Sequence, residues 1–157
     1  MTLERSTLVT ALVLMSAAAG TVQAQTGQNH IGPRLSYHFD VEELGVGAQF
    51  SVPLARYLEF YPSFDYFLVS SGTLWHLNAD LKYRIASESI DWLYLGAGLN
   101  LAHRSVGSVD DTRAGVNAFV GIESRRGRVH PFGELRLTVN DDNSSAQLAA
   151  GINFTLR

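Results

Sequence analysis

Alternation of apolar and polar side chains, sustained along most of the chain, constrains the fold more than any other feature of the sequence. In residues 75–85 the odd-numbered side chains, such as Leu77, are apolar and the even-numbered ones, such as Asp80, are polar. This period of two places successive side chains on opposite faces of a strand, whereas a helix repeats about every 3.6 residues. The pattern predicts eight strands, at residues 30–39, 44–52, 57–69, 73–85, 91–104, 112–124, 130–139 and 145–156.

The links between these segments are short and contain turn residues. Sequential strands joined in this way pair as antiparallel neighbours. An up-and-down order of this kind can close into a barrel, which leaves no free edge. We therefore predict an all-β chain that folds as one eight-stranded antiparallel up-and-down β-barrel. The sequence has no cysteine, which excludes a disulfide framework, a thiol nucleophile and a Cys-ligated metal.

The first residues have the form of an export signal rather than of a strand. Arg5 precedes an apolar run at residues 8–19, and small residues lead up to Ala24. Because the run is too short to span a bilayer as a helix, we predict a signal peptide at residues 1–24, cleaved after Ala24. The barrel domain then comprises residues 25–157. No later apolar run is long enough to predict a transmembrane helix.

Two barrels fit this pattern, and they differ in which face of the sheet lies inside. A soluble, lipocalin-like barrel has an apolar interior, whereas a membrane barrel has an apolar exterior and a polar interior. Aromatic residues near strand ends, such as Tyr37 and Trp75, suit a bilayer interface, and most glycines fall on the polar face, where a narrow barrel needs room. We therefore predict a transmembrane barrel. Pro62 cannot donate to a strand ladder, so we expect a β-bulge there.

The eight alternating segments after a cleaved signal resemble the small outer-membrane β-barrel family of the outer membrane protein A and X type. The resemblance is architectural and covers nearly all of the predicted mature chain. It implies a bacterial outer-membrane location, contact with outer-membrane lipids including lipopolysaccharide, insertion by the barrel-assembly machinery, and a monomer. It also implies that four short links face outside the cell, namely those at Asp40, Ser70, Ser105 and Asn140. Family members usually end on an aromatic residue, whereas here Phe154 is followed by three more residues.

Charged side chains of both signs fall on the predicted inner face and are the first candidates for function. Carboxylates and bases together can exchange protons or line a channel. The lumen of an eight-stranded barrel is just filled by side chains, however, and buried charges must be paired to be tolerated. We therefore expect a structural interior charge network, with a narrow pore as an alternative. Its predicted members are Arg34, Glu59, Asp65, Asp80, Lys82, Arg84, Arg104, Arg113, Glu123, Glu134 and Arg136.

His103 and Ser105 are the candidates for catalysis, since alternation places both on the lipid face. A lipid-facing His-x-Ser motif is similar to that of membrane-embedded lipid A deacylases, which are also eight-stranded barrels. Those enzymes usually continue with Asn, where this chain has Val106, and no acidic partner stands out on the lipid face. We predict a non-enzymatic barrel with a structural or envelope role, and keep a lipid A deacylase-like hydrolase as an alternative.

The remaining polar residues predict no cofactor and no metal site. His38 and His76 share the inner face, with Asp65 nearby, a set that could bind a metal but is more typical of a hydrogen-bonding network. A net charge of −3 without basic blocks argues against nucleic acid as a partner.

Overall fold

The structure, a computed structural model, describes residues 27–87, 89–141 and 143–156. The predicted signal peptide at residues 1–24 therefore lies outside the described residues. Within the described ranges, no helix is long and apolar enough to cross a membrane. The strands are β1 (His30–His38), β2 (Glu43–Ala55), β3 (Leu58–Phe67), β4 (Thr73–Arg84), β5 (Leu93–Val106), β6 (Val109–Glu123), β7 (Val129–Asn140) and β8 (Ser144–Thr155).

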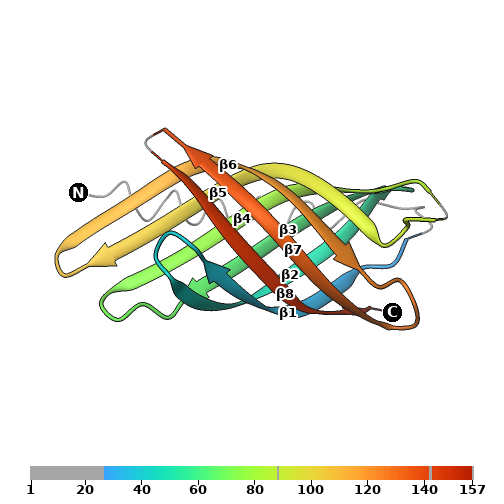
Figure 1. Ribbon diagram of the computed structural model, residues 1–157, viewed down its shortest axis with the longest axis horizontal. Helices are drawn as coiled ribbons and strands as arrows, with labels where there is room; N and C mark the ends of the chain where they lie inside the picture. Colours follow the sequence, from blue (N-terminus) through green and yellow to red (C-terminus); the bar gives the residue numbers. More distant parts are fainter. Residues whose placement is uncertain (1–26, 88, 142, 157) are drawn as a thin grey trace.

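The eight strands form one closed antiparallel barrel in sequence order (Figure 1). Each strand pairs with its neighbours in the chain, and β1 also pairs with β8, from His30 opposite Thr155 to His38 opposite Gln147. The predicted all-β, eight-stranded, up-and-down architecture is confirmed, and every predicted strand overlaps an observed one. Closure gives each strand a hydrogen-bonding partner on both sides, which a sheet surrounded by lipid requires.

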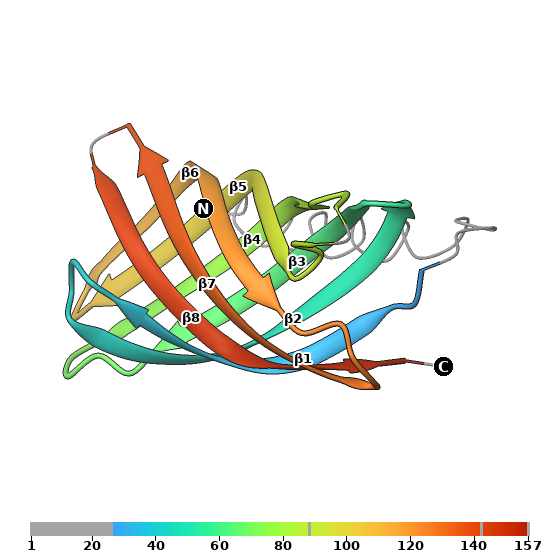
Figure 2. The ribbon, with the colours of Figure 1, turned by 45° about the vertical axis from the view of Figure 1, so that its right-hand side comes forward.

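The barrel has two distinct ends (Figures 1 and 2). At the end that we call the terminal end lie the start of β1, the end of β8 and the links from β2 to β3, from β4 to β5 and from β6 to β7. At the opposite, hairpin end lie the links from β1 to β2, from β3 to β4, from β5 to β6 and from β7 to β8. Since His30 pairs with Thr155, the two ends of the barrel sequence lie side by side.

The β5–β6 hairpin projects from the hairpin end of the barrel. We expected a longer link here, but only residues 107–108 separate the two strands. Gly107 adopts a φ of +63°, a left-handed conformation that glycine tolerates and that suits such a tight turn. Pairing between β6 and β7 begins only at Gly115, so residues 109–114 of β6 have no partner on the β7 side. This part of the hairpin therefore extends beyond the closed wall of the barrel.

Polar side chains occupy the inside of the barrel and apolar side chains cover the outside, as predicted. Leu35 and Leu99, on the outer face, are each 64% exposed, whereas Arg34 and Arg136 are each 1% exposed. A soluble barrel of the lipocalin type would show the reverse arrangement. The outward-facing aliphatic and aromatic side chains instead form an apolar belt suited to the hydrocarbon layer of a bilayer.

The prediction of a β-bulge at Pro62 is wrong. Strand β3 keeps one register with β4 throughout, with Pro62 opposite Ala79. Its register with β2 is the same before and after Pro62 and shifts only between Pro53 and Ala55. Pro62 therefore removes one N–H donor from the hydrogen-bond ladder without adding a residue to the strand. The register shift instead lies next to Pro53, at the end of β2.

Candidate functional site

Five charged side chains meet inside the barrel and form what we call the central network. Arg136 donates from Nη1 to Asp80 Oδ2 at 2.6 Å and from Nη2 to Glu134 Oε1 at 2.9 Å. Arg34 places Nη2 3.5 Å from the same Glu134 oxygen and Nε 3.1 Å from Asp65 Oδ1. Each of the five side chains belongs to a residue that is at most 1% exposed. The central network therefore joins β1, β3, β4 and β7 across the lumen.

Four more charged side chains form the terminal network, which lies towards the terminal end. Lys82 Nζ lies 2.6 Å from Glu123 Oε2 and 3.6 Å from Glu59 Oε2. Arg84 donates from Nη2 to Glu123 Oε2 at 2.7 Å, and its Nε donates to Glu59. Each carboxylate therefore contacts both cations, which ties β3, β4 and β6 together.

Neutral side chains supply further hydrogen bonds to these carboxylates. A charge taken out of water is tolerated only when it is paired and its remaining hydrogen-bonding capacity is used. Every carboxylate of the two networks has at least one cationic partner, which favours a static, structural role over proton exchange. The additional donors are Asn117 to Asp80 at 3.0 Å, Tyr94 to Glu134 at 3.1 Å, Gln147 to Asp65 at 3.1 Å and Asn153 to Glu123 at 2.7 Å, together with the hydroxyls of Ser36 to Asp65 and of Ser51 to Glu59.

Between the charged groups lies a buried aromatic cluster of Tyr61, Tyr94 and Phe119, which our sequence analysis missed. Lys82 Nζ lies 4.3 Å from the centre of the Tyr94 ring and 4.7 Å from that of Tyr61. The guanidinium of Arg136 lies 4.7 Å from the centre of the Phe119 ring. These distances are those of cation–π contacts, so the rings stabilise the same cations that the carboxylates bind.

Two glycines on the inner face make room for these rings. Gly121 lies opposite Tyr94, and Gly96 lies opposite Phe119. A Cβ atom added to Gly121 would lie 2.3 Å from Tyr94 Cζ, and one added to Gly96 would lie 2.2 Å from Phe119 Cζ. Alternation already places both aromatic residues on the inner face. Their parity, combined with a glycine at the paired position of the next strand, is the signal that could have located them.

Two histidines close the interior towards the hairpin end. The rings of His38, His76 and Phe67 lie with their centres 5.0–5.4 Å apart in each pair. His38 Nδ1 is 3.7 Å from Asp40 Oδ2, which exceeds hydrogen-bond distance. Among the residues that the structure describes, no group of three or more His, Cys, Asp or Glu could hold a metal ion. The histidines pack as aromatic rings over the mouth of the barrel.

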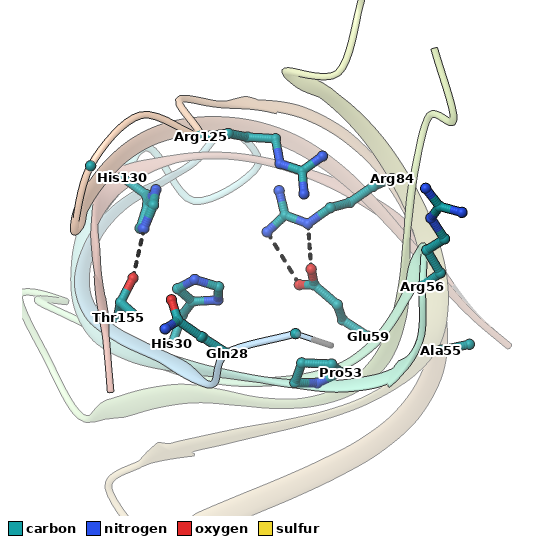
Figure 3. A pocket seen from close by; sticks show the side chains of 12 residues that line it. Gln28, His30, Pro53, Ala55, Arg56, Glu59, Arg84, Arg125, His130 and Thr155 are labelled. Carbon is teal, nitrogen blue, oxygen red and sulfur yellow. Dashed lines mark hydrogen bonds and ion pairs between the residues drawn. The ribbon is translucent and has the colours of Figure 1, made fainter. Parts of the chain in front are cut away.

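A cavity of about 370 Å³ opens at the terminal end, and we call it the vestibule (Figure 3). Arg84 and Glu59 of the terminal network line it, and their ion pair faces the opening. On the other side, His130 Nε2 forms a hydrogen bond of 2.8 Å with Thr155 Oγ1. The His30 ring lies edge-on to that of His130, with 4.9 Å between their centres. The vestibule is therefore a polar recess bounded on its inner side by ion-paired side chains.

Three solved structures are similar to this barrel. The N-terminal β-barrel domain of OprF from Pseudomonas aeruginosa has a TM-score of 0.71 at 15% sequence identity, covering 85% of this chain and all of its own. The chain has the fold of the small outer-membrane β-barrels. Neisserial surface protein A has a TM-score of 0.58 at 17% identity, covering 82% of this chain and 95% of its own. Ail of Yersinia pestis has a TM-score of 0.51 at 14% identity, covering 82% of this chain and 97% of its own. No family model and no curated protein matches the sequence.

A small outer-membrane β-barrel belongs in the bacterial outer membrane, and the surface of this chain fits that location. The outer face carries exposed apolar side chains on all sides of the closed sheet. The ionic side chains of the central and terminal networks lie inside, where lipid does not reach them. The fold and the apolar belt together support the predicted outer-membrane location.

The predicted interior charge network has to be corrected at Arg104 and Arg113, which the outer-membrane barrel exposes to solvent. Arg113 pairs with Asp111 at 2.7 Å, and both side chains are 47% exposed. Both arginines have the parity of the inner face, but they lie on the projecting β5–β6 hairpin. The hairpin faces water there because the opposite wall of the barrel has ended. The other predicted members lie in the central and terminal networks.

The structure does not bring His103 and Ser105 together. His103 Nδ1 forms a hydrogen bond of 2.8 Å with Thr112 Oγ1, and its ring stacks on Trp75 with 5.1 Å between centres and 24° between planes. Within the described part of the barrel, no hydrogen bond joins His103 to Ser105 and no carboxylate orients His103. The contacts expected of a nucleophile held by a base, and of a base held by an acid, are therefore not formed by these residues.

Proposed function

We propose that the protein is a non-enzymatic integral outer-membrane β-barrel with a structural role in the cell envelope, and that its interior seals the lumen. The observation that carries this proposal is a layer of large side chains, each at most 1% exposed, inside the barrel. A continuous path for water would leave some of these atoms accessible. The members of the layer are Arg34, Tyr61, Lys82, Tyr94, Glu123, Glu134 and Arg136.

The ion pairs act as struts between strands that are not neighbours. Arg136 on β7 binds Asp80 on β4, and Arg34 on β1 reaches Glu134 on β7. Because each charge is buried, a wall that moved away from its partner would leave an ion without compensation, which costs about 3–5 kcal/mol. The networks thus favour one cross-section of the barrel, as expected of a rigid envelope component.

The proposal extends to orientation and partners, by analogy with the family that the sequence resembles. The terminal end faces the periplasm, since a chain of this type enters from that side, and the hairpin end faces outwards, where lipopolysaccharide surrounds it. The barrel-assembly machinery inserts the chain. The protein is a monomer, since closure through β1 and β8 leaves no sheet edge in the barrel wall for a second copy to pair with.

The first test is membrane fractionation with heat-modifiability. The full chain is expressed, outer membranes are isolated, and gel mobility is compared between unheated and boiled samples. We expect a membrane-bound band that shifts on boiling, because the closed barrel resists detergent until heated. A soluble periplasmic protein without a shift would refute the membrane assignment.

Planar-bilayer recordings of the purified protein separate the sealed barrel from the narrow pore. We expect no discrete conductance steps above those of a protein-free detergent control. Reproducible single-channel steps that depend on the folded band would replace the sealed barrel with a pore.

Mass spectrometry of lipid A tests the hydrolase alternative. Cells expressing the protein should carry the same acyl chains on lipid A as cells expressing the Ser105→Ala variant. Loss of one acyl chain with the unaltered protein, and its retention with Ser105→Ala, would show that the barrel is an enzyme.

A further inference from the structure

The lipid-facing surface of β6, β7 and β8 is hollowed near the terminal end. Two adjoining hollows of about 480 and 370 Å³ share Ile122 and Gly133 in their lining. Gly133 has the outward parity of β7, and a Cβ atom added there would meet only Ile122 Cγ1, at 3.9 Å. The small side chain of Ala150, opposite Gly133 on β8, extends the depression. We call this surface the outer groove.

One end of the outer groove reaches the terminal rim of the barrel. Trp92, Ser124 and Pro131 line that end, and Trp92 is 45% exposed. Tryptophan is enriched where hydrocarbon meets lipid headgroups. The rim of the groove therefore lies at headgroup depth, while the part around Gly133 lies deeper in the apolar layer.

A cluster of arginines adjoins this rim. The link of residues 124–128 carries Arg125, Arg126 and Arg128, all of them exposed. In the described part of the chain, no carboxylate lies within 4.0 Å of a guanidinium of these three residues. Arg125 points over the vestibule (Figure 3). Arg126 and Arg128 belong to the same link, which begins at Ser124 in the lining of the groove. Arginine donors in this setting suit a phosphate group, which they can bind through two parallel hydrogen bonds.

We propose that the outer groove is a binding site for one anionic glycerophospholipid of the periplasmic leaflet. An acyl chain lies along Gly133 and Ile122, and the phosphate meets Arg126 and Arg128 at the rim. The proposal rests on the membrane location and orientation proposed above. It adds a specific lipid partner, since a barrel in general needs only a shell of any lipid.

A second copy of the chain fits the groove less well than a lipid does. A symmetric dimer would place the same surface of both copies in contact, because a two-fold interface is self-complementary. Within one membrane both copies have the same orientation, so the two arginine-bearing links would face each other. Like charges brought together in this way oppose association, whereas a lipid phosphate neutralises them.

The test is native mass spectrometry of the detergent-purified full chain with added phosphatidylglycerol or phosphatidylcholine. We expect one phosphatidylglycerol to be retained in preference to phosphatidylcholine. Arg126→Gln and Arg128→Gln should each lower that retention about fivefold, from the contribution of one arginine near an anionic lipid surface. Gly133→Leu fills the groove and should lower the retention of both lipids.

Matched control variants lie on the opposite side of the barrel. Arg56→Gln removes an arginine from another link at the terminal end, and Ala48→Leu enlarges an outward-facing side chain on β2. Both should retain phosphatidylglycerol like the unaltered protein. Equal retention of the two lipids, an equal loss with Arg56→Gln, or a dimer in place of a lipid adduct would overturn the proposal. The boiling-dependent gel shift of each variant distinguishes these results from failure to form a barrel.

Discussion

Arg136 is the side chain whose loss should destabilise the barrel most. It is 1% exposed, and among the described residues it is the one ionic partner of Asp80, at 2.6 Å, while it also donates to Glu134 at 2.9 Å. The substitution Arg136→Gln removes the cation and leaves both carboxylates buried. Its effect should therefore exceed that of any exposed arginine on the same chain.

The size of the destabilisation depends on which partners the two carboxylates keep after the substitution. Removing one partner of a buried pair typically costs about 3–5 kcal/mol. Glu134 retains Arg34 at 3.5 Å and the Tyr94 hydroxyl at 3.1 Å, whereas Asp80 retains only neutral partners such as Asn117, at 3.0 Å. Because Glu134 remains compensated and Asp80 does not, we expect a loss near the lower end, about 3 kcal/mol.

The assay is denaturant unfolding of the barrel from lipid vesicles, followed by the fluorescence of Trp75 and Trp92. Arg113→Gln is the matched control, because sequence parity assigns both arginines to the inner face but the Arg113 side chain is 47% exposed. The exposed pair should contribute less than about 1 kcal/mol. If the two variants unfold at the same denaturant concentration, or Arg136→Gln costs less than Arg113→Gln, the reasoning about the central network is refuted.

Three further predictions follow from the same structure. Leu99→Arg puts a charge on the lipid face, so it should lower the stability of the inserted barrel by about 2–4 kcal/mol and reduce the heat-modifiable band. Ala102→Arg, three residues along β5 and with inward parity, should insert normally. Equal yields of the two variants would contradict the assignment of inner and outer faces. Gly121→Ala drives a Cβ atom into the Tyr94 ring and should lower the free energy of unfolding by about 1–3 kcal/mol. Gly133→Ala, where the added Cβ atom makes only an ordinary contact with Ile122 Cγ1 at 3.9 Å, should change it by less than about 0.5 kcal/mol. The free energy of unfolding of the unaltered protein in urea should be nearly the same at about 0.1 and 1 M NaCl, because salt screens buried ion pairs weakly. A marked loss of stability in high salt would mean that water enters the networks.

The order and pairing of the strands could be predicted because they depend on local pattern. In residues 75–84 the polar residues, such as His76 and Lys82, are buried and the apolar ones, such as Leu81 and Tyr83, face outwards, as their alternation predicts. Short links then make each strand the neighbour of the next. These two properties suffice for the architecture and for the assignment of inside and outside.

The position of a residue along the barrel axis could not be predicted in this way. Parity places Arg104 and Arg113 on the same face as Arg136, but it contains no information on where the opposite wall ends. That depends on the register of β6 against β7, which begins only at Gly115 and follows from closure of the whole sheet. The position of a charged residue along the barrel axis, rather than the face of the sheet on which it lies, therefore decides whether it is buried.

The aromatic cluster escaped prediction for a related reason. The sequence argument used only the aromatic residues near strand ends, such as Tyr37 and Trp75, whereas Tyr61, Tyr94 and Phe119 lie inside by parity. The rings of Tyr94 and Phe119 fit because a glycine lies at the paired position of the neighbouring strand, which is a property of register between strands and not of one segment. Residue type was a poorer guide than position in the alternation.

Pairing of β1 with β8 also determines how the barrel must form. The contacts that complete the sheet join residues from opposite ends of the barrel sequence, such as Ile31 and Phe154. A chain still missing β8 has two unpaired edges and cannot yet close, so closure of the sheet has to wait for β8. A truncation that removed β8 would therefore leave an open sheet prone to pair with other chains.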